Sequence, residues 1–455
     1  MKQETIKYIS LLCFSAAFVF LSALLNFDYP ASRLFSWQLL HPSIDVWVLL
    51  ILLAIAASVG KRLLFWTSLP VYTLFLALRL IRLGDTVVPM YLNRPFNLYI
   101  DSAYLFGLYD LLKTSSRQED IFLLSLSVVV VVLVGITLSW YAWQAAARCL
   151  LDYRLRVLFL IVSCLVFSTA FIRGSHPEKT PTMVRLGQEI LSIGKQLDQQ
   201  KDVVARIEKI ARTRGPGATS LKGLEGADVL LFIVESYGHI VFSRPQYRQA
   251  MEGTLANFAT ILDQQGFMAV SSYLVSPTYG GISKLAHGTL EFSLRVDNKI
   301  EYTALLRSSL TPLASHFRRS GYRTVSVMPG TRFVYPEGVS YDYEQAYYSW
   351  HFNYQGPTFG WAPMSDQFVL DWVRRREFTK REKPIFARYV MISSHAAFSI
   401  QPPFIADWNL IGDGSIYNKQ QLVYYPIHWP NLKNAGDAYL RSLDYDFATL
   451  GDYFA

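Results

Sequence analysis

Long apolar segments are confined to the first 172 residues, and they constrain the fold more than any other feature of the chain. Residues 8–25 form the first of these segments, and Lys2 and Lys7 precede it. Further apolar segments follow at residues 44–59, 63–81, 121–145 and 157–172. A helix needs roughly 20 apolar residues to cross a bilayer core. The sequence therefore predicts an N-terminal polytopic α-helical membrane domain of about five spans.

The distribution of basic residues predicts the orientation of these spans. Alternate connections and the N-terminus carry Lys2, Lys7, Lys61, Arg62, Arg148, Arg154 and Arg156. Cytoplasmic loops are enriched in Lys and Arg, so this side is expected in the cytoplasm, and five spans then place the rest of the chain outside it. A sixth span within residues 82–120 would reverse that placement. Its aromatic-rich part, residues 87–112, is interpreted instead as an interfacial helix or re-entrant turn.

Composition limits the classes of partner and of metal ligand. The formal net charge is +8, but the basic residues are scattered and show no nucleic-acid-binding motif, so membrane-flanking charge explains the excess. No nucleic-acid partner is expected. All the cysteines, Cys13, Cys149 and Cys164, lie in or beside apolar segments. Any metal bound by the rest of the chain must therefore have oxygen and imidazole ligands.

Three parts follow from the changes in pattern along the chain. Residues 1–175 are the predicted transmembrane domain. Residues 176–226 form an amphipathic helical connector, with apolar residues at helical spacing over 182–212, and a hinge rich in glycine and proline. Residues 227–455 are the predicted catalytic domain.

Strand and helix patterns alternate in this last part. Strands are predicted at residues 229–234, 266–275, 323–328 and 384–394. Helices are predicted at residues 255–265, from 283 onward, at 303–319 and at 365–376. Such alternation predicts an α/β domain with a mainly parallel sheet and helices on both faces. The uninterrupted apolar run at 229–234 is typical of a central strand buried on both faces.

Two polar elements in this region predict a metal and nucleophile site. Glu235 directly follows the apolar run, at the carboxyl end of its strand, where ligands bind in open α/β sheets. Later in the chain, Gly280 and Gly281 precede Ser283, where a helical pattern begins. A hydroxyl at that position, next to a cation held by a carboxylate, is suited to act as a nucleophile.

This order of strand, Glu, helix, strand and Gly-Gly-x-Ser resembles the alkaline-phosphatase superfamily. The similarity is greatest to its membrane-anchored sulfatase-like branch, which includes lipoteichoic acid synthases and phosphoglycerol and phosphoethanolamine transferases. It covers residues 228–455. The resemblance implies that Glu235 and Ser283 bind a divalent metal (zinc, manganese or magnesium) and that Ser283 is the catalytic nucleophile. Thr278, which lies before the glycines, is the alternative nucleophile.

Other residues near the predicted strand ends are assigned roles by the same resemblance. His395 matches a Ser-x-His element whose His contacts the substrate phosphate, although the sequence continues His-Ala-Ala rather than His-x-Pro. Lys284 is expected to steady an anionic leaving group, and Arg332 to bind phosphate. Trp350 and Trp361 are expected to stack on a sugar or headgroup, with simple packing as the alternative.

One element of the family is missing. Relatives complete the metal site with an Asp-His pair late in the chain, and this sequence contains no Asp-His dipeptide. The helical pattern at residues 437–454 resembles the helix that precedes that pair. We therefore expect a C-terminally incomplete domain that binds a divalent metal weakly or not at all. The alternative is that other residues complete the site, with His351, His395 and Asp366 the first suspects.

The resemblance implies an enzyme of the cytoplasmic membrane whose C-terminal domain faces the periplasm or cell surface. Its expected reaction transfers a phospho-headgroup from a membrane lipid donor to an envelope glycan or glycolipid acceptor, through a covalent Ser283 intermediate. One alternative is a hydrolase of sulfate or phosphate esters, although the Pro and Arg of the sulfatase motif are absent after Ser283. The other is an inactive scaffold or regulator.

Overall fold

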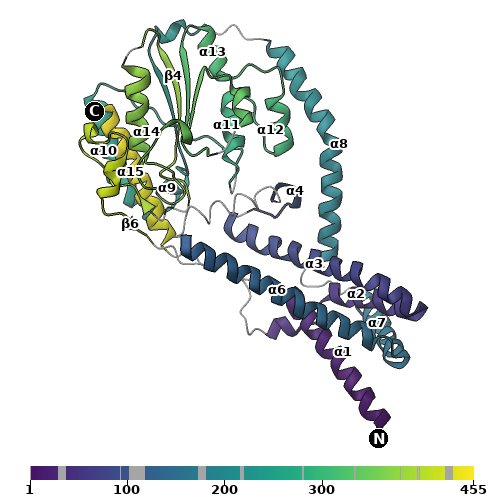
Figure 1. The fold of residues 1–455 in the computed structure, drawn as a ribbon. Helices are drawn as coiled ribbons and strands as arrows, with labels where there is room; N and C mark the ends of the chain where they lie inside the picture. The colour runs from purple at the N-terminus through teal and green to yellow at the C-terminus, as the bar shows by residue number, and fades with distance from the viewer. Residues whose placement is uncertain are drawn as a thin grey trace. The chain divides into compact units, whose positions relative to one another are not determined.

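The structure is a computed structural model. It describes residues 2–28, 37–92, 94–101, 118–172, 181–215, 220–278, 281–332, 335–379, 381–396, 398, 400–425 and 434–455. The chain divides into two compact units (Figure 1). The helical unit comprises residues 1–105, 122–198 and 279–281, and the α/β unit comprises residues 106–121, 199–278 and 282–455. The division falls within α8 (Thr182–Arg214), inside the predicted connector.

Each predicted apolar segment lies in a helix of the helical unit. These helices are α1 (Lys2–Asn26), α2 (Ile44–Val59), α3 (Lys61–Leu92), α6 (Gln118–Cys149) and α7 (Tyr153–Ile172). Within the described residues, three stretches are long and apolar enough to cross a membrane: Tyr8–Asn26, Lys61–Met90 and Ser125–Cys149. These helices support an association with a membrane. The count of five spans stays a prediction.

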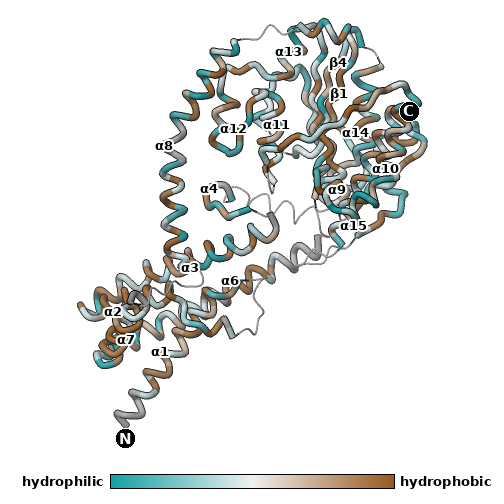
Figure 2. Tube along the Cα trace, turned by 180° about the vertical axis from the view of Figure 1, so that it is seen from behind, coloured by the Kyte–Doolittle hydropathy of each residue, from teal (hydrophilic) through white to brown (hydrophobic). Residues whose placement is uncertain are grey.

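Apolar side chains cover the outside of this unit as well as its interior. Leu21, Leu50 and Trp143 are fully buried, whereas the valine run of α6, Val128–Val132, is about half exposed. Figure 2 shows hydrophobic residues along these helices. Exposing apolar surface to water costs roughly 25 cal/mol per Å². The surface of this unit is therefore suited to lipid rather than to water.

The region expected to be an interfacial loop is partly helical. α3 continues to Leu92, past the predicted end at residue 81, and it contains Pro89. A short helix, α4 (Leu98–Asp101), follows. The rest of the segment predicted to be an interfacial helix, a re-entrant turn or a sixth span, residues 102–117, lies outside the described residues.

The α/β unit contains a parallel sheet, as the sequence predicts. Its strands are β1 (Val229–Val234), β2 (Arg323–Met328), β3 (Gln345–Tyr348) and β4 (Ile385–Met391), in the order β1-β4-β2-β3. All adjacent strands pair in parallel. A short antiparallel pair, β5 (Ile400–Gln401) with β6 (Val423–Tyr424), lies apart from this sheet.

Two predictions about strands are wrong: that residues 266–275 form a strand, and that β1 lies at the centre of the sheet. The segment predicted as a strand at 266–275 forms no strand, and its residues Met268, Val270 and Leu274 are each about nine-tenths exposed. As a result β1 pairs only with β4 among the described strands, and it lies at the edge of the sheet rather than at its centre. Its residues are half-buried. An apolar run predicts a strand but does not specify how many neighbours it has.

Helices cover both faces of the sheet (Figure 1). One face carries α14 (Asp366–Val373) and, beyond it, α15 (Ala435–Phe454) and α10 (Pro245–Gln264). The other carries α11 (Ser283–Phe292), α12 (Lys299–Leu306) and α13 (Leu313–Arg319). β4 has apolar side chains for both layers, because neighbouring residues of a strand point to opposite faces. Ala387 and Tyr389 belong to the core that contains α14, and Phe386 stacks on Phe317 of α13 at 4.0 Å.

The predicted helices exist, with different bounds. α10 begins at Pro245, ten residues before the predicted start, because proline is well accommodated in the first turn of a helix. The predicted helix at 303–319 is two helices, α12 and α13, with Pro312 immediately before the second. Proline lacks the backbone N–H that a continuous helix requires. The C-terminal helical pattern is confirmed as α15.

A buried ion pair attaches α11 to the sheet. The Arg388 guanidinium on β4 donates to the Glu291 carboxylate on α11 at 2.8 Å, and both side chains are almost fully buried. The Tyr343 hydroxyl donates to the same carboxylate at 2.7 Å. Taking two charges out of water is unfavourable, and their mutual attraction offsets that cost only while both are present.

We therefore expect Glu291→Gln to destabilise the protein by about 3 to 5 kcal/mol, because the Arg388 charge would remain buried without its partner. Thermal and denaturant unfolding of the purified full chain in detergent would measure the change. Arg206→Gln is the control, since Arg206 pairs with Glu301 at 2.7 Å but is 58% exposed. Breaking an exposed pair should cost less than about 1 kcal/mol. Equal effects of the two substitutions would contradict the role assigned to the buried pair.

Candidate functional site

Glu235 lies at the carboxyl end of β1, where the sequence places it. Its side chain is 15% exposed. The next residue, Ser236, has a left-handed backbone conformation with φ of 59°. Two hydrogen bonds hold this turn: the Ser394 hydroxyl donates to the Glu235 carbonyl at 2.5 Å, and the Tyr439 hydroxyl donates to the Ser236 carbonyl at 2.8 Å. The carboxylate is thus presented by a fixed turn.

α11 brings a histidine to this carboxylate. His287 Nε2 lies 3.8 Å from Glu235 Oε1, and the His287 side chain is buried. Ser283 is the first residue of α11 and is exposed. Residues four apart lie on the same face of a helix, so the Ser283 hydroxyl precedes His287 by one turn on the face that meets Glu235. Ile282, just before, has a φ of 60°, which is strained for a β-branched residue.

Burial shifts the protonation of both groups toward their neutral forms. It raises the pKa of Glu235 to about 7, with a further contribution from the charge of Asp366. Burial, aided by the Arg388 charge, lowers the pKa of His287 to about 3. Near neutral pH, His287 is therefore a neutral imidazole, and Glu235 is close to the midpoint of its titration. A carboxyl group with a pKa near the working pH is suited to accept and release protons.

Two more carboxyl groups lie in the interior near the same edge. Asp366, the first residue of α14, accepts hydrogen bonds from the backbone N–H groups of Ile392 and Ser393 at 2.9 and 2.6 Å. Asp446 of α15 is fully buried, and its carboxyl group faces Asp366 and Ser394. Burial and the charge of Asp366 raise the pKa of Asp446 well above its usual range. Burial therefore favours the neutral form of Asp446.

The described residues do not form a recognisable metal centre. No group of three or more His, Cys, Asp or Glu side chains in the described part of the chain is arranged to hold an ion. Asp366 already accepts from two backbone N–H groups. His351 follows β3, at the opposite edge of the sheet from β1, and adjacent strands are about 4.8 Å apart. Its Nδ1 accepts from the Tyr348 backbone N–H at 2.9 Å.

His395, Trp361 and Arg332 lie together, although they are far apart in sequence. The rings of His395 and Trp361 stack with their centroids 3.7 Å apart, and the Arg332 guanidinium donates to the Trp361 carbonyl. Gly330 permits this arrangement, because a Cβ atom at this position would lie 2.7 Å from the Trp361 ring. Three residues predicted to contact substrate thus form one group, and the Ser394 hydrogen bond links its histidine to the turn at Glu235.

The protonation of His395 changes its expected role. Its Nδ1 lies 2.6 Å from the Ala396 carbonyl, which can only accept, so Nδ1 carries the hydrogen. Burial lowers the pKa of this imidazole. In the neutral ring Nε2 is therefore a lone-pair acceptor, and it donates to a phosphate only when a second proton is bound.

The remaining predicted residues have other neighbours. Lys284 Nζ lies 3.9 Å from Glu337 Oε1 and 5.6 Å from the centre of the Tyr302 ring. Trp350 is 49% exposed and contacts the Tyr348 ring, with centroids 5.0 Å apart, next to β3. The Thr278 hydroxyl is hydrogen-bonded to the Ser276 hydroxyl at 2.9 Å. No described contact joins Trp350 or Thr278 to Glu235.

Two residues of this region receive no role from the sequence. His287 is one of them, yet its side chain contacts Glu235. Its spacing was a usable signal, because Ser283, His287 and Glu291 repeat at intervals of four along one helical face. Asp446 lies within the helical pattern at residues 437–454, and nothing local in the sequence indicates its burial.

These features define a class: an α/β unit with a parallel sheet and a polar site at its carboxyl edge, preceded by helices apolar enough for a membrane. Comparisons of this chain with protein-family models, with curated proteins and with solved structures found no match. Any assignment of function therefore rests on the motifs and on the site itself.

The raised pKa of Glu235 predicts the sign of a pH effect. Between its ordinary pKa of 4.5 and about 7, the folded state holds a proton that the unfolded state has released. Stability should therefore fall as the pH rises through this window, by up to about 1.4 kcal/mol per pH unit for one group.

Unfolding of the full chain in detergent between these pH values measures the slope. Asp446 contributes in the same direction, so the wild-type slope includes more than one group. Glu235→Gln should reduce the slope, whereas Glu252→Gln, on the exposed surface of α10, should leave it unchanged. A slope that is the same in both variants would show that Glu235 does not hold the proton.

Proposed function

We propose that this protein is a membrane-bound transferase that moves a phospho-headgroup, of the phosphoglycerol or phosphoethanolamine type, from a lipid donor to an envelope glycan or glycolipid. The observation that carries the proposal is the position of Ser283. Its hydroxyl is exposed at the start of α11, one turn before the histidine that contacts Glu235. A nucleophile within reach of groups that can take up its proton is the arrangement expected for covalent catalysis.

In the first step the Ser283 oxygen attacks the phosphorus of the lipid headgroup. The new bond joins the serine oxygen to phosphorus, and the bond from phosphorus to the diacylglycerol oxygen breaks. The Ser283 proton passes by way of His287 to Glu235, which then gives a proton to the departing alkoxide. In the second step an acceptor hydroxyl attacks the same phosphorus and passes its proton to Glu235, the bond from the serine oxygen to phosphorus breaks, and Glu235 returns a proton to the Ser283 oxygen. Glu235 is suited to this exchange of protons because its pKa is about 7.

The proposal includes a divalent metal as a possible ligand of Glu235 and Ser283 but assigns it no step of the reaction. The resemblance gives Glu235 and Ser283 as ligands, and a bound cation would stabilise charge on the phosphoryl oxygens. Among the described residues these two side chains do not make a complete site, because zinc takes at least three protein ligands and harder cations take more oxygens. No step above therefore passes through a metal.

Three residues near the turn at Glu235 are assigned to substrate binding. Trp361 and His395 present a stacked pair of rings, and Arg332 beside them carries a permanent positive charge. Lys284 directly follows the nucleophile and is placed to meet an anionic headgroup. Trp350 follows β3, at the opposite edge of the sheet from β1, and is proposed to bind a more distant part of the acceptor.

Hydrolysis is the second candidate function, because the exposed Ser283 is open to water as well as to an acceptor.

Ser283→Ala should abolish turnover while leaving the fold intact. Loss of one hydroxyl at a helix N-terminus costs about 0.5 to 2 kcal/mol of stability, far less than a domain's total. The assay follows headgroup release from labelled phosphatidylglycerol and phosphatidylethanolamine in vesicles with the full chain reconstituted. Each variant is also tested for its unfolding midpoint.

Thr278→Ala is the matched control and should keep activity. Activity lost in Thr278→Ala but kept in Ser283→Ala would transfer the nucleophile to Thr278. Release of free phosphate compounds without any acceptor would favour the hydrolase, and full loss with a chelator would show that a cation takes part. No headgroup release under any of these conditions would support an inactive scaffold.

We also propose that the α/β unit faces the outside of the cytoplasmic membrane. The basic residues at the ends of the apolar helices support that orientation. An alkaline phosphatase reporter fused after residue 173 should therefore be active, and a fluorescent protein that matures only in the cytoplasm should be dark at the same position. A reporter fused after residue 60 should give the opposite pair of signals. A bright cytoplasmic reporter after residue 173 would reject both the orientation and the envelope substrate.

A further inference from the structure

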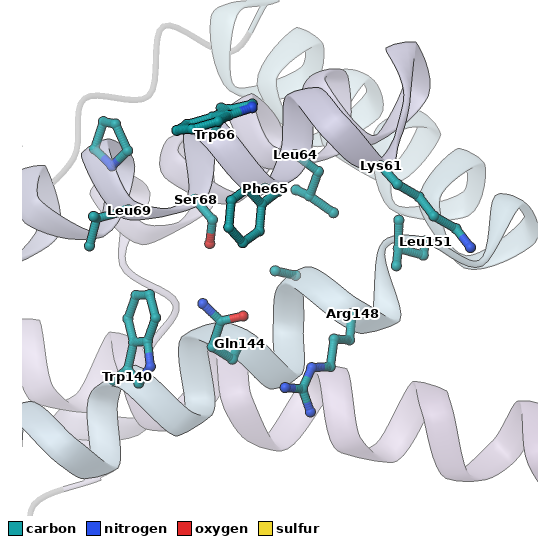
Figure 3. A pocket seen from close by; sticks show the side chains of 12 residues that line it. Lys61, Leu64, Phe65, Trp66, Ser68, Leu69, Trp140, Gln144, Arg148 and Leu151 are labelled. Atoms are coloured by element: carbon teal, nitrogen blue, oxygen red, sulfur yellow. The ribbon is translucent and has the colours of Figure 1, made fainter.

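A cavity of about 590 Å³ lies in the helical unit, between α3 and α6 (Figure 3). Cavities of this size commonly bind small molecules. Every residue that lines it belongs to the helical unit, including Leu151 in the turn after α6. Its interpretation therefore depends on no residue of the α/β unit and stands apart from the proposed function.

The two ends of this cavity differ in chemistry. Trp66, Leu69 and Trp140 contribute large apolar surfaces, and Trp66 and Leu69 are each about two-thirds exposed. Lys61 and Arg148 both lie toward the other end, on different sides of Leu151, as Figure 3 shows. Both cations are exposed, and neither has an ion-pair partner among the described side chains. The cavity thus combines an uncompensated charge of +2 with an apolar wall.

The positions of these cations along their helices match the depth of a lipid headgroup. Lys61 is the first residue of α3, and Arg148 lies in the last turn of α6. Both helices include stretches long and apolar enough to cross a membrane, so their ends lie near the interface and their middles in hydrocarbon. Leu69 and Trp140 lie nearer the middles of the two helices, at the depth of the acyl chains.

We propose that this cavity binds one anionic glycerophospholipid of the surrounding bilayer. The phosphate lies between the Lys61 ammonium and the Arg148 guanidinium, and part of an acyl chain lies against Trp66, Leu69 and Trp140. A small soluble anion does not account for the apolar wall. A zwitterionic lipid would bring a third positive charge next to Lys61 and Arg148, and no acidic residue lines the cavity to compensate it. Basic pockets between transmembrane helices bind anionic headgroups on these grounds.

The experiment compares lipid binding to two double variants of the full chain. Purified protein in detergent is titrated with phosphatidylglycerol or phosphatidylcholine, and bound lipid is counted by native mass spectrometry. Lys61→Gln/Arg148→Gln removes the proposed phosphate ligands. Arg62→Gln/Arg154→Gln is the matched control, because it removes the same charge from neighbouring exposed residues that do not line the cavity.

The wild type should bind phosphatidylglycerol in preference to phosphatidylcholine. Each basic residue near a lipid headgroup is worth roughly a fivefold change in affinity, so Lys61→Gln/Arg148→Gln should weaken phosphatidylglycerol binding by roughly 30-fold. The control should change it by less than about threefold, because charge at the same depth but outside the cavity acts only at longer range. Equal losses in both variants would mean general surface attraction and overturn the proposal. Equal binding of the two lipids by the wild type would overturn it as well.

Discussion

The ion pair between Arg388 and Glu291 is the interaction on which the site depends. It lies at the junction of β4 and α11, with both side chains almost without exposure. α11 has no other described charged contact with the sheet that is equally buried, and its first turn carries Ser283. The pair therefore sets the position of the helix, and the helix sets the distance from His287 to Glu235. The same Arg388 charge also helps to keep His287 neutral. One buried cation thus determines both a geometry and a protonation state.

How far the sequence predicts this arrangement depends on the range of the interaction. The strands at β1, β2 and β4 and the start of α11 were predicted, because a period of two or an apolar run is local. The strand predicted at 266–275 is wrong because forming a strand also depends on a partner that is distant in the sequence. Its residues favour a strand, but pairing needs a neighbouring edge, and the described segment meets none. Propensity in strands is decided by such neighbours.

The same distinction explains the site residues. The positions of Glu235 at a strand end and of Ser283 at a helix start were predicted because each lies next to a recognisable local element. The grouping of His395, Trp361 and Arg332 depends on loops that follow different strands and meet only in three dimensions. The tautomer of His395 follows from a contact with the next residue's carbonyl, which no pattern of residue types predicts. Local chemistry was therefore predictable, and its assembly was not.

Protonation of the carboxyl groups at the carboxyl edge of the sheet competes with binding of a divalent cation there. Glu235 has its pKa raised from 4.5 to about 7, so ionising it in place costs roughly 3 kcal/mol more than in water. Burial and the charge of Asp366 also raise the pKa of Asp446. A divalent cation would have to displace the proton of Glu235, and its own charge would offset that cost. Within the described residues, protons and hydrogen bonds from the backbone already balance these carboxylates. Binding of a cation at this edge should therefore strengthen as the pH rises toward 7, as the competing proton is lost.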